Sequence, residues 1–192
     1  MPEPSPEMNE FQDEPAEPLI VSSDLVYKGS VWDVRKEVFD YHGKEITRQF
    51  VDHTGAVAVL AMDAEGNVLL IQQYRHPIRM RDWELPAGLL DVAGEPPLEA
   101  AMRELEEEVD LVAAEWSVLV EFYSTPGGSN EKITVFLAKE LSASAEAFAR
   151  YDEEADILKR WAPLEEIVDG VLTGRLHNSI LAIAVLAAHA AR

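Results

Sequence analysis

From residue 19 onward, short runs of apolar and β-branched residues are separated by glycine, proline and asparagine, a pattern that predicts strands. Residues 55–62 (GAVAVLAM) are almost all apolar, as expected for a strand buried on both faces. Residues 63–66 (DAEG) separate them from a strand at residues 67–74 and favour a hairpin connection. Further strands are predicted at residues 19–27, 30–41, 45–51, 116–123, 133–138 and 157–162.

The clearest helical period lies at residues 99–110. Apolar side chains recur there every three or four positions, so one stripe of this helix is expected to face the core. The stripe consists of Leu98, Ala101, Met102, Leu105 and Val109.

A loop containing Pro77 and Pro86 leads toward this helix, and two further helices close the chain. The first of these helices is predicted at residues 164–172. Asn178 or Ser179 can cap the second, alanine-rich helix at the end of the chain. Strands and helices mix without a regular alternation of strand and helix. The pattern therefore predicts an α/β fold with mixed sheets sandwiched between helices.

The polar side of the helix at residues 99–110 carries an unusual concentration of acids. Glu104, Glu107 and Glu108 share one face, where like charges repel each other. They also lie toward the helix C-terminus, where the macrodipole disfavours anions. Binding of Mg²⁺ explains this arrangement, because Mg²⁺ takes carboxylate oxygens as ligands. The alternative is an acidic surface helix in which Arg103 forms i,i+4 ion pairs with Glu99 and Glu107.

Composition narrows the functional classes. The 192 residues suit one domain with a sizeable core, and the absence of cysteine excludes disulfides, thiolate metal sites and cysteine nucleophiles. A formal net charge of −20 argues against binding to nucleic acid. The same charge would repel an anionic substrate unless cations or local arginines intervene.

The termini suggest a cytoplasmic protein without a membrane partner. Residues 1–18 are rich in proline and glutamate and are expected to form a disordered acidic tail, with no signal peptide. The most apolar segment, residues 180–191, is too short to span a membrane.

The acidic helix belongs to a longer motif. The chain reads Gly88-x6-Glu95-x7-Arg103-Glu104-Leu105-x-Glu107-Glu108-x-Asp110-Leu111. This resembles the Nudix box, G-x5-E-x7-R-E-U-x-E-E-x-G-U with U apolar, and every charged position is present. The chain departs from the box in two places: one extra residue precedes Glu95, and Asp110 replaces a glycine. Aspartate tolerates the left-handed conformation that ends a helix, so the turn can still form.

The resemblance to the Nudix hydrolase family implies an α/β/α sandwich that hydrolyses a nucleoside diphosphate linked to another group. It also implies Mg²⁺ as the cofactor, with Mn²⁺ as a substitute. Metal cations bound by the protein would offset the repulsion between the acidic chain and a diphosphate. Glu95 and Arg103 would orient the metal ligands. Those ligands would be the carboxylates of Glu104, Glu107 and Glu108 and the backbone carbonyl of Ala87, with Glu107 also counted as catalytic.

Three segments outside the box resemble the ADP-ribose pyrophosphatase branch of this family. They are residues 73–77 (QYRHP), residues 83–88 (WELPAG) and a loop in which Pro126 lies 15 residues after Leu111. The resemblance implies cleavage of ADP-ribose to AMP and ribose 5-phosphate. Two alternatives remain open: a pyrophosphatase acting on nucleoside-diphosphate sugars more broadly, and a non-catalytic ADP-ribose sensor.

Resemblance to this branch also implies a set of substrate-binding residues. One of them is Pro126, in the loop that follows the box. Arg48 and Arg75 match positions that contact the diphosphate or the terminal ribose, although strand-end ion pairing is an alternative. Trp32 would stack on adenine, or it is a core tryptophan. Glu131 would contact a ribose, or it is a solvated loop acid.

A general base is expected in the loop at residues 152–156, with Glu153 favoured over Glu154 and a merely solvated loop as the alternative. Glu99 and Glu106 are expected to be solvated, and the five histidines are assigned no chemistry. The branch commonly forms homodimers, so residues 19–51 are interpreted as an N-terminal β segment that contributes to a dimer, although a monomer could carry the same strands. Residues 52–192 then form the hydrolase domain.

Overall fold

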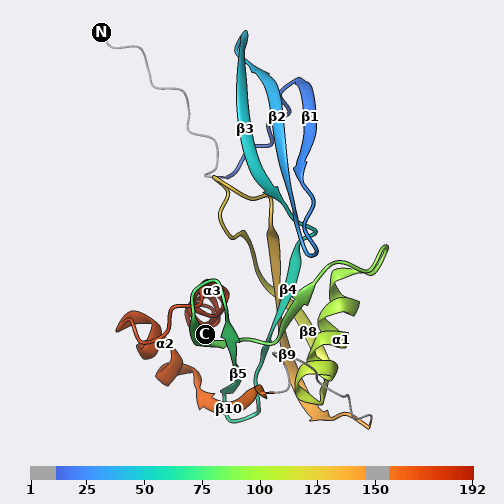
Figure 1. The fold of residues 1–192 in the computed structure, drawn as a ribbon. Coiled ribbons are helices and arrows are strands. Elements are labelled where there is room, and N and C mark those ends of the chain that lie inside the picture. The colour runs from blue at the N-terminus through green and yellow to red at the C-terminus, as the bar shows by residue number, and fades with distance from the viewer. Residues whose placement is uncertain (1–11, 146–155) are drawn as a thin grey trace, which may run out of the picture.

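The computed structural model describes residues 12–145 and 156–192, which form three sheets with helices packed around two of them (Figure 1). Residues 12–18 of the expected tail are exposed and have no regular secondary structure. The N-terminal sheet contains β1 (Ile20–Tyr27), β2 (Asp33–Tyr41) and β3 (Lys44–Asp52). The second sheet contains β5 (Asn67–Arg75), β6 (Met80–Glu84) and β10 (Leu158–Pro163), and the third contains β4 (Ala56–Ala61), β7 (Ala87–Leu89), β8 (Leu111–Tyr123) and β9 (Lys132–Ala143). The helices are α1 (Pro97–Val109), α2 (Leu164–Leu172) and α3 (Ser179–Ala190).

Strand β4 is the centre of the core, as its apolar run predicts. All six of its residues are buried, and it pairs in parallel with β9 and in antiparallel fashion with β7. Its side chains alternate between two clusters. Val57, Val59 and Ala61 pack with residues of α1, whereas Ala58 and Leu60 pack with residues of α2 and α3. The predicted α/β/α sandwich with mixed sheets is therefore confirmed.

The N-terminal sheet extends away from this sandwich (Figure 1). Its three strands are antiparallel in the order β1-β2-β3, and every residue of β1 is exposed. The exposed residues include large apolar side chains at Ile20, Val21, Leu25, Val26 and Tyr27.

The predicted hairpin between residues 55–62 and 67–74 is confirmed only at its turn, where the Asp63 N–H donates to the Asn67 carbonyl at 3.0 Å. Strands β4 and β5 lie in different sheets and share only a single bridge between Met62 and Val68. Strand β5 pairs with β6 and β10, whereas β4 pairs with β9 along its whole length and with β7 at Ala56–Ala58. The Asp63 side chain instead accepts from the backbone N–H of Asn67 at 2.7 Å and turns the chain toward the second sheet.

The expected loop around Pro77 and Pro86 contains two short strands. Strand β6 pairs with β5, and β7 pairs with β4, so this segment connects the two sheets of the sandwich. Pro86 lies between the two strands, and its carbonyl accepts from the N–H of Val59 at 2.8 Å. The sequence predicts a loop here rather than two strands, because proline is common in loops and rare inside strands.

The predicted apolar stripe of α1 is partly wrong. Leu98 and Met102 are 36% and 39% exposed, whereas Leu105 and Glu108 are buried. In this orientation the Glu108 carboxylate accepts the backbone N–H of Ala87 in β7 at 2.9 Å. The buried residues of α1 are Ala100, Ala101, Leu105, Glu108 and Val109.

This orientation predicts unequal costs for two truncations on one helix. Leu105→Ala should lower the free energy of unfolding by about 2–5 kcal/mol, because it leaves a cavity in the core. Met102→Ala, at an exposed position, should cost less than about 1 kcal/mol. Urea unfolding of both variants measures the difference, and equal losses would contradict the observed helix orientation.

The ends of the helices follow local rules. Pro96 and Pro97 begin α1, and Asp110 ends it with a φ of 61°, in the left-handed conformation that the sequence predicts. At α3, the Asn178 side chain accepts from the N–H of Leu181 at 3.0 Å, which confirms the predicted cap. None of the helices in the described ranges is both long and apolar enough to cross a membrane.

Candidate active site on the acidic helix

Arg103 is the centre of the polar face of α1. Its guanidinium donates two hydrogen bonds to Glu95, both of 3.0 Å, and further bonds to Glu104 at 2.7 Å and Glu107 at 3.2 Å. These bonds hold the pKa of the Glu95 carboxyl below its usual range and raise the pKa of Arg103. The i,i+4 pair with Glu107 is present, but it is one contact of a wider network rather than a simple surface pair.

The network around Arg103 leaves no space for a side chain at Gly88 in β7. A Cβ built on Gly88 would overlap the Cγ, Cδ and Oε1 atoms of Glu104. The Glu104 side chain therefore lies directly over the Gly88 backbone and is only 14% exposed. Any larger residue at position 88 must displace the Glu104 carboxylate.

Glu108 lies against the same strand. Its carboxylate accepts the Ala87 N–H, and the residue is 6% exposed. Glu107 is more open, with a side chain that is 42% exposed. The structure thus brings Ala87, Glu104, Glu107 and Glu108 together where α1 meets β7, as the family motif implies.

The donor set at this place fits a hard divalent cation. Three carboxylates, those of Glu95, Glu104 and Glu107, bond to the Arg103 guanidinium, so its single positive charge offsets only part of their negative charge. The Glu108 carboxylate adds a fourth negative charge on the same helix and bonds to the Ala87 N–H. Within the described part of the chain, no three acidic or histidine side chains already converge into a metal cage. A cation would therefore take carboxylates that Arg103 and the Ala87 N–H hold in this structure.

Arg75 forms the strand-end ion pair that the alternative interpretation predicts. Its Nε and Nη2 atoms donate to Glu84 at 2.7 and 2.6 Å, and Glu84 is buried. Arg75 is nevertheless 44% exposed and lines a hollow of about 290 Å³ that also includes Ala87 and Asn178. Sequence reasoning missed Glu84, although it lies inside the quoted segment at residues 83–88.

Arg48 and Pro126 line one groove. It has a volume of about 470 Å³ and lies between β3 and the loop at residues 125–131. The Arg48 guanidinium donates to the Thr47 carbonyl at 2.9 Å, and no ion pair of Arg48 occurs among the described residues. Tyr123 and Asn130 also line this groove.

Trp32 is not a core tryptophan. It is 44% exposed and lines a separate hollow of about 460 Å³ with Asp52 and His53. An exposed indole at the mouth of a hollow is available for stacking. Within one chain, Trp32, Arg75 and the pair Arg48–Pro126 therefore lie in three different hollows.

Glu131 is not a solvated loop acid either. Its carboxylate accepts from the Ser124 Oγ at 2.5 Å and lies 3.5 Å from Nε2 of His53. The side chains of Glu131 and His53 are 24% and 9% exposed. Sequence patterns assign His53 no chemistry, and only its position at the end of a predicted strand could have drawn attention to it.

Two other acids of α1 have partners that the sequence did not predict. Glu106, expected to be solvated, accepts from the Ser144 Oγ at 2.5 Å. Asp110 forms an ion pair with Lys159 at 2.7 Å in addition to ending the helix. Glu153 and Glu154, the predicted bases, lie outside the described residues.

Comparison with known proteins agrees with this geometry. A family model described as NUDIX domain matches residues 52–180. The chain is 46% identical over 171 residues to an ADP-ribose pyrophosphatase of Mycobacterium tuberculosis, covering 88% of this chain and 82% of that protein. It is 34% identical to an ADP-ribose pyrophosphatase of Bacillus subtilis, with 86% and 89% of the two chains covered.

The chain is also similar to a relative with a different name and to a solved structure. A methanol dehydrogenase activator of Bacillus methanolicus is 33% identical, with 86% of this chain and 89% of that protein covered. A crystal structure of an ADP compounds hydrolase superposes with a TM-score of 0.75 at 20% identity, covering 93% of this chain and 95% of that one. At that identity the superposition supports the fold.

Proposed function

The chain belongs to the Nudix hydrolase family, and we propose that it cleaves the diphosphate bond of ADP-ribose to give AMP and ribose 5-phosphate. The observation that carries the proposal is the acidic face of α1, where Glu104 lies over Gly88 and Glu108 contacts Ala87. The relatives named ADP-ribose pyrophosphatase support the choice of substrate.

Glu104, Glu107, Glu108 and the Ala87 carbonyl are the groups that would hold the metal, for which we propose Mg²⁺, with Mn²⁺ as a substitute. Divalent cations bound there would neutralise the diphosphate and activate a water. Arg103 donates to Glu104 and Glu107 at 2.7 and 3.2 Å, and Glu95 fixes Arg103 in turn. These two residues therefore orient the ligands. Glu153, or else Glu154, is the proposed base that takes the proton of the attacking water.

The remaining candidates bind the substrate. Arg48 and Arg75 are both partly or fully exposed and can donate to phosphate oxygens through their planar guanidinium groups. Trp32 presents an open ring to a base, and Glu131 presents a carboxylate near the Pro126 loop to ribose hydroxyls.

A homodimer is proposed because these groups lie in separate hollows of one chain. Residues 19–51 form a sheet whose apolar side chains on β1 are exposed, and this surface suits a second copy. Residues 52–192 then form the hydrolase domain. Light scattering should give twice the mass of the 21.4 kDa chain, and a monomeric mass at working concentrations would contradict this assignment.

A substrate panel separates the proposed activity from its alternatives. With Mg²⁺ or Mn²⁺ present, kcat/KM should be highest for ADP-ribose among ADP-ribose, UDP-glucose and GDP-mannose. Comparable values for all three would favour a broad nucleoside-diphosphate-sugar pyrophosphatase. Tight ADP-ribose binding without turnover would favour the sensor, although the chain retains every charged position of the box.

A further inference from the structure

The Pro126 loop is joined to the end of the N-terminal sheet by backbone bonds. The Val51 N–H in β3 donates to the Gly128 carbonyl at 2.9 Å, and the Asn130 N–H donates to the Val51 carbonyl at 3.3 Å. Val51 and Ser129 form a parallel bridge. These backbone bonds therefore hold the loop against the end of β3.

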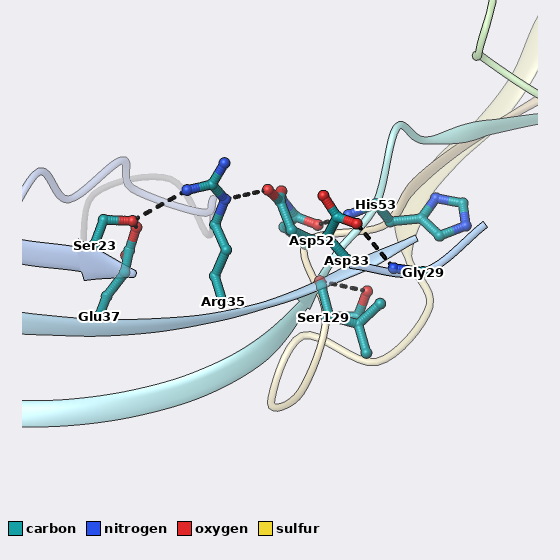
Figure 2. A network of polar contacts seen from close by, with 10 residues as sticks. Ser23, Gly29, Asp33, Arg35, Glu37, Asp52, His53 and Ser129 are labelled. Carbon is teal, nitrogen blue, oxygen red and sulfur yellow. Dashed lines mark hydrogen bonds and ion pairs between the residues drawn. The ribbon is translucent and has the colours of Figure 1, made fainter. Parts of the chain in front are cut away.

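Three side chains reinforce this junction. Asp52, the last residue of β3, accepts from the Arg35 Nε on β2 through Oδ2 and from the Asn130 Nδ2 at 2.8 Å through Oδ1. The Asn130 Oδ1 in turn accepts from the His53 N–H at 2.8 Å. Figure 2 shows the Arg35 side chain rising from its strand, with its guanidinium between Ser23 and Asp52 and with His53 beyond Asp52. Arg35, Asp52 and Asn130 thus form a continuous chain from β2 to the loop, which we call the junction triad.

The sequence at this junction is not what sheet stability alone favours. Asp52 lies directly opposite Asp33 in the β2–β3 register, and like charges at opposed positions destabilise a sheet. Arg35 relieves the repulsion by bonding to Asp52. The hydrogen bonds from Arg35 and Asn130 keep the pKa of Asp52 below its usual range despite partial burial, so the carboxylate stays charged.

The junction triad lies between two candidate substrate surfaces. Asp52 lines the hollow that contains Trp32, and Asn130 lines the groove that contains Arg48 and Pro126. The bond between the Asn130 amide and the Asp52 carboxylate therefore connects these two surfaces.

We propose that Arg35, Asp52 and Asn130 are positioning residues that fix the Pro126 loop against the N-terminal sheet and so hold the Trp32 and Arg48 surfaces in register for the nucleotide. The inference rests on the proposed function, because it assumes that these surfaces receive the substrate. The side-chain bonds of the triad involve the N-terminal sheet, the loop and His53 directly after β3, whereas those of the acidic face of α1 involve Arg103 and β7. Loss of a triad residue should therefore weaken substrate binding and leave the chemical step intact.

Hydrogen exchange of the full-length protein tests the junction without any substrate. Arg35→Met removes a side chain whose hydrogen bonds go to Asp52 and Ser23 rather than to the loop, yet we expect faster amide exchange at residues 125–131. Glu37→Gln is the matched control, because Glu37 lies on the same strand and bonds to Ser23 within the sheet. Unchanged exchange of the loop in Arg35→Met would overturn the proposal.

Steady-state kinetics provide the second readout. Arg35→Met and Asn130→Ala should each raise KM for ADP-ribose about tenfold and change kcat less than about twofold. Because they act through one carboxylate, the double variant should raise KM no more than the worse single variant. Equal falls in kcat, or fully additive effects on KM, would contradict a shared positioning role.

The two readouts separate the failure of this inference from failure of the proposed function. If the wild-type protein does not turn over ADP-ribose, the proposed function fails, and exchange at the loop still reports on the junction. If ADP-ribose is cleaved but Arg35→Met changes neither exchange nor KM, only the junction inference fails.

Discussion

Replacing Glu104 with glutamine should lower kcat/KM for ADP-ribose by about 100-fold or more in the presence of Mg²⁺. Loss of a residue that merely supports a metal ligand typically costs about 10- to 100-fold, and Glu104 is assigned as a ligand itself. The substitution keeps the shape of a side chain that is 14% exposed but removes its charge, so the fold should be retained. Steady-state kinetics at saturating Mg²⁺ measure the effect.

Glu99→Gln is the matched control for that variant. Glu99 lies on the same helix, is exposed, and forms no side-chain hydrogen bond within the described part of the chain. It should retain wild-type turnover. Glu108→Gln should resemble Glu104→Gln, and full turnover in both of these variants would contradict a metal site on α1.

Gly88→Ala should lower kcat/KM by about 10- to 100-fold while changing the free energy of unfolding by less than about 1 kcal/mol. The added methyl group would overlap the end of the Glu104 side chain, which can rotate away at modest cost. Gly88 lies in strand β7 without a left-handed φ, and the atoms nearest to an added Cβ all belong to the Glu104 side chain. The substitution therefore displaces a candidate ligand without breaking the sheet, and kinetics together with urea unfolding distinguish the two effects.

Combining Gly88→Ala with Glu104→Gln checks the cause. If Gly88 acts by leaving room for Glu104, the double variant should be no less active than Glu104→Gln alone. A further large loss in the double variant would mean that the methyl group damages the site by another route.

Features that depend on local sequence could be predicted. The apolar run of β4 indicates a strand buried on both faces, and the Asn178 cap follows from the preference of asparagine for that position. Helical spacing alone places Glu104, Glu107 and Glu108 on one face of α1. Their nearness to Ala87 and Gly88 follows only from the family motif.

Features that depend on pairing between distant segments could not be predicted. The face of α1 that contacts the sheet includes Glu108, which bonds to Ala87, and no periodicity of apolar residues includes a buried glutamate. Likewise, the hairpin at residues 63–66 ends after one bridge, because β5 pairs with β6 and β10 rather than with β4. Local turn chemistry gives no information about which strands become neighbours.

In the candidate site, too, contacts between residues close in sequence could be predicted and contacts between distant segments could not. Arg103 and Glu107 form an i,i+4 pair, so that contact follows from helix geometry. The pairs Arg75–Glu84 and His53–Glu131 join residues whose proximity is set by strand register and loop packing. Sequence patterns therefore do not identify these partners, and burial and bonding show that the alternatives of a core Trp32 and a solvated Glu131 are wrong.

The proposed function depends on metal-dependent cleavage of a diphosphate bond at the acids of α1. Product analysis of ADP-ribose incubated with the wild-type protein, with Mg²⁺ and separately with a chelator, measures that cleavage itself. We expect equal amounts of AMP and ribose 5-phosphate with Mg²⁺ and no cleavage with the chelator. Intact ADP-ribose in the presence of Mg²⁺, or cleavage that the chelator leaves unchanged, would contradict a metal-dependent hydrolase.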